Sequence, residues 1–250
     1  MWRFAEAGWG MKALGLGCAL LLPALASAET SLAQASYAGS PLAMMGMLAL
    51  LSLLPFAVLM LTSFSKIAVV LSLARSAMGT QQAPPTLVLT GLAVVLTGHI
   101  MAPVMERMYD AGQAAYEEVH SGAQLVSAAK QVTEPLRGFL MKHGSPEERA
   151  RFVDLARELR PPEESDQVQE TDLFVVIPAF VITELKEAFQ IGFIVFLPFL
   201  VLDMVIANVL LALGMQTLSP SQVSLPFKIL LFVAVDGWAL LARGLILGYR

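Results

Sequence analysis

The stretch "IPAFVITELKEAFQIGFIVFLPFLVLDMVIANVLLALGM", residues 177–215, decides how this chain folds. It is almost wholly apolar, and it is about twice as long as the ~20 residues with which one helix crosses a membrane. It nevertheless carries Glu184, Lys186, Glu187 and Asp203. A charged side chain at the bilayer centre costs at least ~2.5 kcal/mol, and the short Asp203 side chain cannot reach far toward the headgroups. We therefore expect these helices to be surrounded by protein rather than by lipid.

The composition of the whole chain places it in or beside a membrane. Of its 250 residues, 56% are apolar and 14% are charged, whereas soluble domains carry about 25% charged residues. The net charge of −4 argues against a nucleic-acid-binding protein. His99, His120 and His143 show no metal-ligand spacing, and the sequence has no nucleophile elbow or phosphate loop. We predict no enzyme activity, no cofactor and no metal site.

The first 28 residues have the layout of a cleavable secretory signal. Lys12 precedes a short apolar run, residues 13–22, and small residues follow up to Ala28. The run is shorter than a membrane span, although an ordinary first transmembrane helix is the alternative. We predict cleavage between Ala28 and Glu29. Cleavage would remove Cys18, which is the single cysteine of the sequence, and with it any thiol chemistry.

Three regions follow the signal, and the predicted fold class is all-α. Residues 29–105 form an apolar helical hairpin region, residues 106–172 a polar helical region outside the cytoplasm, and residues 173–250 an apolar helical hairpin. The polar region holds 14 acidic and 8 basic residues. Within it, "SPEERARFVDLARELRPP" predicts an amphipathic helix that Ser145 caps, with Glu148 at the capping-box position.

Charges and prolines indicate how the apolar runs are arranged. Lys66 and Arg75 lie in the first hairpin loop, which the positive-inside tendency places on the cytoplasmic side. Each proline in an apolar run removes a backbone hydrogen bond that neighbours must replace. Bent, interrupted hairpins suit an assembled pore better than a straight bundle in lipid. These prolines are Pro55, Pro103, Pro178, Pro198 and Pro226.

Two long motifs resemble one known family. "LPFAVLMLTSFSKIAVVLSLARSAMGTQQAPP", residues 54–85, resembles the first signature of the FliP/SctR (YscR, HrcR) family of type III export-apparatus proteins. Residues 177–215, followed by "LSPSQVSLPFKILLFVAVDGW" at 218–238, resemble the second. The "GLILGY" ending and part of the polar region are similar to the injectisome branch, which we favour. "LARSAMGTQQAPP" and the signal are closer to the flagellar branch.

This resemblance implies a subunit of a protein-export gate. Members form a homopentamer that assembles with FliQ/SctS-like and FliR/SctT-like subunits at the bacterial inner membrane, at the base of the secretion apparatus. Unfolded protein substrates pass through the centre of the gate. Much of the apolar surface packs against neighbouring subunits, and the assembled gate is lifted largely out of the bilayer toward the periplasmic side.

The resemblance also implies a pore loop at Met215, Gln216 and Thr217. Relatives carry a run of methionines there, which closes the pore as a gasket, and only the first methionine is kept here. Methionine is flexible and apolar, and uncharged Gln and Thr can hydrogen-bond around a ring without salt bridges. The alternative is a plain hairpin loop turned by Ser219 and Pro220.

A second implied site is an ion pair between Glu184 of one subunit and Lys228 of the next. A buried pair can fix register, and the loss of one partner costs about 3–5 kcal/mol. We further predict that Asp203, Asn208 and Asp236, which lie in apolar runs, pack against protein.

Two other functions stay open from the residues alone. A small ion-coupled secondary transporter would place Asp203, Lys228 and His99 in an ion path, and internal repeats would support it. We find no repeat between the two halves of the sequence. A structural scaffold without an open passage is the other alternative.

Overall fold

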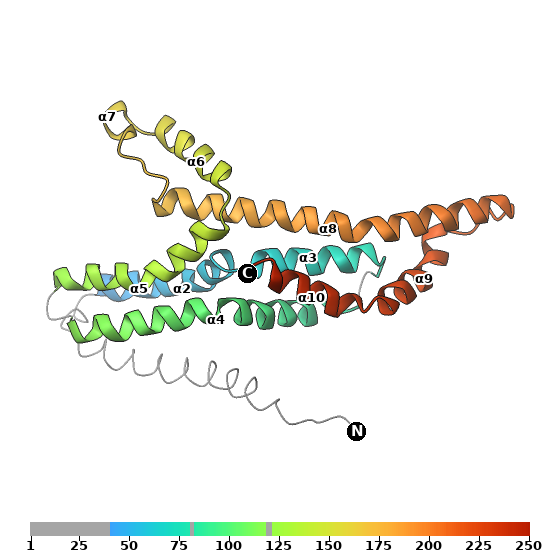
Figure 1. Ribbon diagram of the computed structural model, residues 1–250, viewed down its shortest axis with the longest axis horizontal. Helices are drawn as coiled ribbons and strands as arrows, with labels where there is room; N and C mark the ends of the chain where they lie inside the picture. Colours follow the sequence, from blue (N-terminus) through green and yellow to red (C-terminus); the bar gives the residue numbers. More distant parts are fainter. Residues whose placement is uncertain (1–40, 81–82, 119–121) are drawn as a thin grey trace, which may run out of the picture. The chain divides into compact units, whose positions relative to one another are not determined.

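The computed structural model describes residues 41–80, 83–118 and 122–250 of the chain. Every regular element within these ranges is a helix, so the predicted all-α class is confirmed (Figure 1). The predicted signal and its cleavage site between Ala28 and Glu29 lie outside the described residues. The chain divides into two compact units, residues 1–56 and 57–250.

The described part of the first unit belongs to helix α2 (Pro41–Met60), which ends just inside the second unit. Its side chains are apolar on all sides, and Met44, Leu48 and Phe56 are among the exposed ones. A helix that is hydrophobic all round needs a partner surface or lipid on every face.

Helix α8 (Leu173–Ala212) organises the second unit, because helices from both halves of this unit pack against it (Figure 1). Its 40 residues correspond to a rod about 60 Å long. Pro178 and Pro198 lie inside it without ending it, so the long apolar run forms one continuous helix. Its neighbours are α3 (Phe64–Ala77), α5 (Gly122–His143), α6 (Pro146–Glu158) and α9 (Pro220–Ala234).

Helix α4 (Thr86–Glu118) joins the apolar and polar regions. It continues past Pro103, so the change in composition at residue 105 lies within one helix. α4 packs against α3 and α5, and the short α7 (Pro162–Ser165) follows α6. The chain turns between α9 and α10 (Gly237–Leu247), where Asp236 has a left-handed backbone with φ of 52°.

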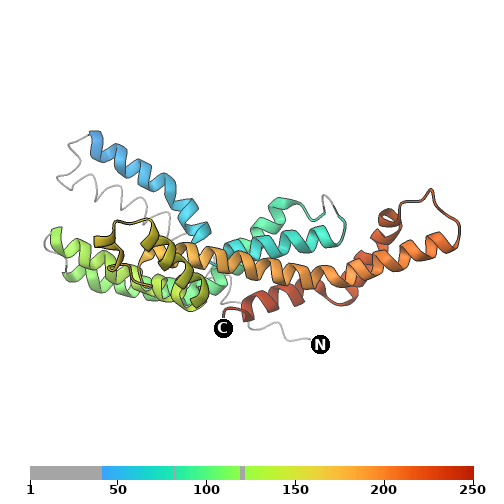
Figure 2. The same cartoon turned by 90° about the horizontal axis from the view of Figure 1, so that it is seen from above.

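Two apolar cores hold this unit together. The larger one joins α3, α4, α8, α9 and α10, and Ile67, Leu71, Phe199 and Phe232 lie in it. The second lies where α4, α5 and α8 meet, and it includes Phe139, Phe180 and Tyr249, which follows α10. α9 folds back along α8 from the tip of their hairpin (Figure 2).

The predicted helix after Ser145 is present, but the predicted capping box is not. The Ser145 side chain makes no capping hydrogen bond, and its backbone N–H donates to Thr183 Oγ1 at 3.0 Å. Glu148 accepts from Arg151 at 3.1 Å and lies 3.6 Å from Lys186 Nζ. A contact with α8 therefore satisfies the helix start in place of the local box.

Much apolar surface is exposed in the described part of the chain. α4 over Thr86–Ala115 and α8 over Leu173–Ala212 are long and apolar enough to cross a membrane, and 11% of the apolar window of α8 is buried. Two bent pairs, α2 with α3 and α9 with α10, pass the same test only when each pair counts as one span. Exposed side chains along α8 include Phe189, Phe193, Ile194, Val201 and Met204.

The contact of α3 with α8 gives a first prediction. Gly192 is buried, and a Cβ atom at this position would overlap the Leu73 side chain, including its Cγ at 3.2 Å. We expect Gly192→Ala to lower the free energy of unfolding by about 1–3 kcal/mol through overpacking. Thermal unfolding of the purified chain in detergent measures this.

Gly98→Ala is the matched control, because no atom lies within 4 Å of a Cβ at Gly98 in helix α4. Alanine there should leave stability unchanged or raise it slightly, since alanine favours helix over glycine. Equal loss in both variants would show that close packing at Gly192 is not the cause.

Candidate functional site: a hairpin loop and two buried ion clusters

The loop between α8 and α9 begins with a well-defined helix end. Gly214 has a φ of 72°, its N–H donates to the Leu211 carbonyl at 3.0 Å, and the Met215 N–H donates to the Leu210 carbonyl at 2.9 Å. These two bonds form a Schellman motif, in which glycine supplies the left-handed residue. Pro220 then starts α9 at a position where its missing N–H costs nothing.

The predicted pore residues Met215, Gln216 and Thr217 therefore lie at the tip of a hairpin with fixed arms (Figure 2). All residues from 211 to 222 are exposed in the single chain, and Met215 is 46% exposed. The loop carries no charge. An exposed, uncharged tip fits either a pore lining or a plain turn, so the geometry is compatible with both interpretations.

An ion pair joins the two arms behind the loop. Lys228 Nζ on α9 lies 2.6 Å from Asp203 Oδ2 on α8, and the Ser224 hydroxyl donates to Asp203 Oδ1 at 2.5 Å. The Lys228 side chain is almost fully buried, whereas that of Asp203 is 36% exposed. A Cβ at Gly79, just past α3, would lie 3.9 Å from Lys228 Nζ. The cluster thus fixes α9 on α8 beside the C-terminal end of α3.

A second cluster surrounds Glu184, whose side chain is completely buried on α8. Lys66 Nζ on α3 lies 2.8 Å from Glu184 Oε1 and 2.7 Å from Glu187 Oε2. The Tyr249 hydroxyl donates to Glu184 Oε2. Lys66 Nζ also lies 4.2 Å from the centre of the Tyr249 ring, within cation–π range. One buried carboxylate therefore connects α3, α8 and the residues after α10.

Aromatic side chains close this second cluster on the side of α5. The Tyr249 ring stacks on Phe139 and lies 5.0 Å from the His143 ring. Burial lowers the pKa of His143 to about 4, and the positive charges of Lys142 and Lys66 add to this effect against the opposing charge of Glu187. Burial and the Glu184 carboxylate raise the pKa of Tyr249. At neutral pH, His143 is uncharged and Tyr249 keeps its proton.

The predicted site residues are thus partly brought together. Glu184 and Lys228 do not meet within the chain, because Lys66 and Asp203 are their respective partners. Their pairing between subunits stays a prediction, and it would require the fully buried Glu184 to leave its present contacts. Asn208 and Asp236 are exposed in the single chain, so their packing against other protein also stays a prediction.

Sequence reasoning missed Lys66, Tyr249 and Ser224 as cluster members. It placed Lys66 in a cytoplasmic loop, but Lys66 lies inside α3 and is 4% exposed. The sequence shows Lys66 within an apolar helix. A lysine in such a place needs a carboxylate partner, just as Glu184 and Asp203 need a basic partner. His99, which the transporter alternative placed in an ion path, lies exposed on α4.

Comparison with known proteins finds one family. A family model described as the FliP family matches residues 47–245. The hypersensitivity response secretion protein HrcR of Ralstonia nicotianae is 45% identical over 206 residues, covering 80% of this chain and 93% of that protein. Yop proteins translocation protein R of Yersinia pestis is 44% identical, covering 81% and 93%. The flagellar biosynthetic protein FliP of Caulobacter vibrioides is 41% identical, covering 94% and 88%.

The second cluster yields a prediction on stability. Lys66→Met leaves Glu184 buried without its cation, and we expect a loss of about 3–5 kcal/mol of unfolding free energy. The double variant Lys66→Met with Glu184→Gln should recover part of this loss, because no charge stays buried. Thermal unfolding in detergent reads both. Lys186→Met, which removes an exposed lysine 3.6 Å from Glu148, is the control and should change little.

The first cluster yields a charge-swap test. We expect Lys228→Asp alone to prevent assembly, because it sets two carboxylates against each other between α8 and α9. Asp203→Lys combined with Lys228→Asp should restore part of the assembly, as read on a native gel. The alternative swap is Glu184→Lys with Lys228→Glu. If this swap restores assembly and the first swap does not, the result would instead support pairing of Glu184 and Lys228 between subunits.

Proposed function

The chain belongs to the FliP family, and from this we infer that it is a core export-gate subunit of a type III secretion system. The match over residues 47–245 carries this proposal, together with the coverage of more than nine-tenths of HrcR and translocation protein R. The names of the relatives refer both to secretion in the hypersensitivity response and to flagellar biosynthesis. The proposed role is to form part of the channel through which unfolded proteins cross the bacterial inner membrane.

The unpartnered apolar surface supports assembly into a larger complex. α8 buries only a small part of its apolar window within the chain, and α2 is apolar on every side. We propose that copies of this chain, as a pentamer, and FliQ/SctS-like and FliR/SctT-like subunits cover these faces. Burial of apolar surface contributes about 25 cal/mol per Å², so such faces provide ample driving force. The bilayer covers whatever the partners leave free.

The position and composition of the hairpin loop are an argument for passage of protein through the assembly. In a ring of subunits, each α8–α9 hairpin would present Met215, Gln216 and Thr217 toward a common centre. Methionine can reshape around a passing chain, and the absence of charge avoids salt bridges that would have to break on opening. The Schellman motif at Gly214 and the Asp203–Lys228 pair keep the base of each hairpin fixed while its tip adapts.

The injectisome branch, which the sequence favours, stays a prediction. Flagellar relatives reach similar identity, since the FliP protein of Pectobacterium carotovorum is 45% identical over 197 residues. This chain covers 73% of that protein but 93% of HrcR and translocation protein R. Coverage does not separate the two branches, because the FliP protein of Caulobacter vibrioides aligns with 94% of this chain and with 88% of its own length, whereas HrcR aligns with 80% of this chain.

Site-specific crosslinking tests the export role. A cysteine at Thr217 should form a disulfide with a cysteine in a substrate that is stalled during export by a folded C-terminal domain. The predicted signal contains the single native cysteine, Cys18, which is replaced by serine in all variants. Leu159→Cys is the control, because this residue is 87% exposed but follows α6 in the polar region.

Crosslinking at Thr217 but not at Leu159 supports a channel. If both positions stay unlinked while secretion proceeds normally, the loop does not contact substrate, and a scaffold without an open passage becomes the better description.

A further inference from the structure

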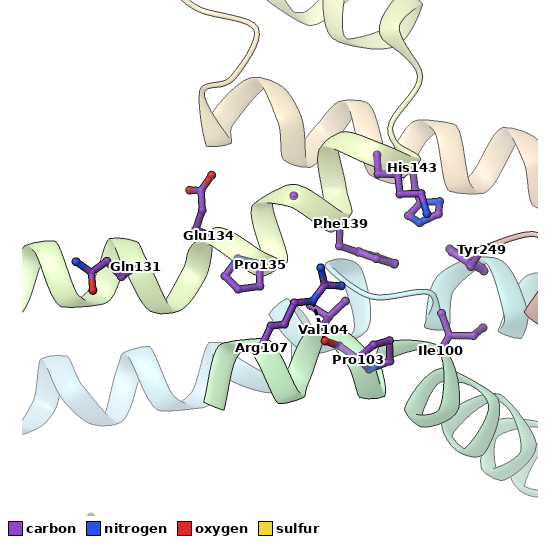
Figure 3. Close-up of a pocket in the computed structure, with 12 residues that line it drawn as sticks. Ile100, Pro103, Val104, Arg107, Gln131, Glu134, Pro135, Phe139, His143 and Tyr249 are labelled. Carbon is purple, nitrogen blue, oxygen red and sulfur yellow. Dashed lines mark hydrogen bonds between the residues drawn. The ribbon is translucent and has the colours of Figure 1, made fainter. Parts of the chain in front are cut away.

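A cleft lies between α4 and α5, and Tyr249 closes one end of it (Figure 3). Its volume is about 600 Å³. The walls are apolar side chains from both helices, and charged groups stand at the rim. The apolar lining consists of Ile100, Pro103, Val104, Pro135 and Phe139.

Arg107 lines this cleft and leaves both of its Nη groups available for a ligand. Its Nε–H donates to the Pro103 carbonyl at 3.0 Å, which orients the guanidinium. Figure 3 shows the side chain reaching from α4 toward α5, into the space between Pro135 and Phe139. Among the described residues, its two Nη groups have no hydrogen-bond or ion-pair partner. A guanidinium fixed in this way presents a planar fork that matches a phosphate or carboxylate.

Further donors reach the cleft from the last turn of α5. Lys142 lines it and has no ion-pair partner in the described part of the chain. His143 is uncharged at neutral pH and supplies one N–H donor. The carboxylate of Glu134 points away from Arg107 in Figure 3 and lies 3.5 Å from Arg137. With Glu134 counted among the lining residues, Arg107 and Lys142 still leave one excess positive charge at the cleft, which favours an anion.

The position of Arg107 along α4 indicates the kind of anion. The apolar part of this helix, residues 86–105, has the ~20 residues that cross the hydrocarbon core of a bilayer. Arg107 follows within one turn, at the depth of the lipid headgroups. Beside it, the cleft offers an apolar wall to an acyl chain. A free inorganic anion would use the cations but not this wall.

We propose that the cleft between α4 and α5 binds an anionic phospholipid, with its phosphate on Arg107 and Lys142 and an acyl chain along Ile100 and Phe139. This inference goes beyond the export role, because it concerns a lipid site away from the hairpin loop. It rests on α4 lying in the bilayer before or during assembly. Bound lipid would fill the gap between α4 and α5 that the chain itself leaves open.

Native mass spectrometry of the full chain in mild detergent tests the proposal, with phosphatidylglycerol as the probe. We expect Arg107→Gln combined with Lys142→Gln to weaken its binding about tenfold or more, since each contact is charge-assisted. Lys130→Gln with Arg157→Gln removes the same charge from exposed side chains outside the cleft and should leave binding unchanged. Equal weakening in both pairs, or equal binding of phosphatidylcholine by the original chain, would overturn the proposal.

A second variant removes the space without altering charge. No atom lies within 4 Å of a Cβ at Gly138, which lines the cleft on α5, so Gly138→Leu can fill it. Loss of phosphatidylglycerol from this variant, with an unchanged unfolding temperature, supports the cleft as the site. Retained binding contradicts it.

Two further results would also overturn the lipid assignment. Complete competition by millimolar inorganic phosphate would show a site for the free anion. Unchanged lipid binding, together with loss of co-purified partner subunits from the Arg107/Lys142 variant, would show a site for an acidic protein surface. None of these measurements depends on secretion. The lipid proposal can therefore fail while the export role holds, and the reverse is also true.

Discussion

The structure depends on a carboxylate that is buried where it could not exist alone. Glu184 is fully enclosed in the middle of the second unit, and an uncompensated charge there would cost several kcal/mol. Lys66 from α3 and the Tyr249 hydroxyl satisfy it. Segments far apart in the sequence must therefore all be in place before the part of α8 around Glu184 is stable. Such a cluster adds less to net stability than an apolar core would, but it penalises every arrangement in which α3 or Tyr249 is shifted.

The charged groups inside the second unit are paired, whereas many apolar side chains on its surface are exposed. The ionic groups on α8 have partners within the same chain, whereas side chains such as Phe193 and Met204 are exposed. A subunit built in this way does not need its neighbours to neutralise the charges of α8. It needs them to cover its apolar surface. Association can therefore rest on shape and area, and the internal ion pairs keep each subunit rigid enough to present that shape.

The sequence was sufficient for the helical class, the apolar lengths and the family, because these follow from composition and from long local motifs. It was insufficient for the partners of the charged residues. Glu184 and Lys228 can be recognised as costly in an apolar run, but only the three-dimensional packing decides that Lys66 and Asp203 neutralise them. The box expected at Ser145 failed for a related reason, since Thr183 of a distant helix supplies the acceptor that local spacing assigned to Glu148. Local sequence patterns show which charged or polar groups require a partner, whereas tertiary contacts determine which residue provides it.

The continuity of α8 has a mechanical consequence. Because Pro178 and Pro198 do not interrupt it, a single stiff rod runs from Glu184 to the base of the hairpin loop, a distance of about 42 Å at 1.5 Å per residue. Apart from the hydrogen bond that Pro198 removes, the helix is unbroken between these two points. A sideways displacement at the tip would therefore appear mainly as a small tilt of this part of α8 about the cluster of Lys66, Glu184 and Tyr249.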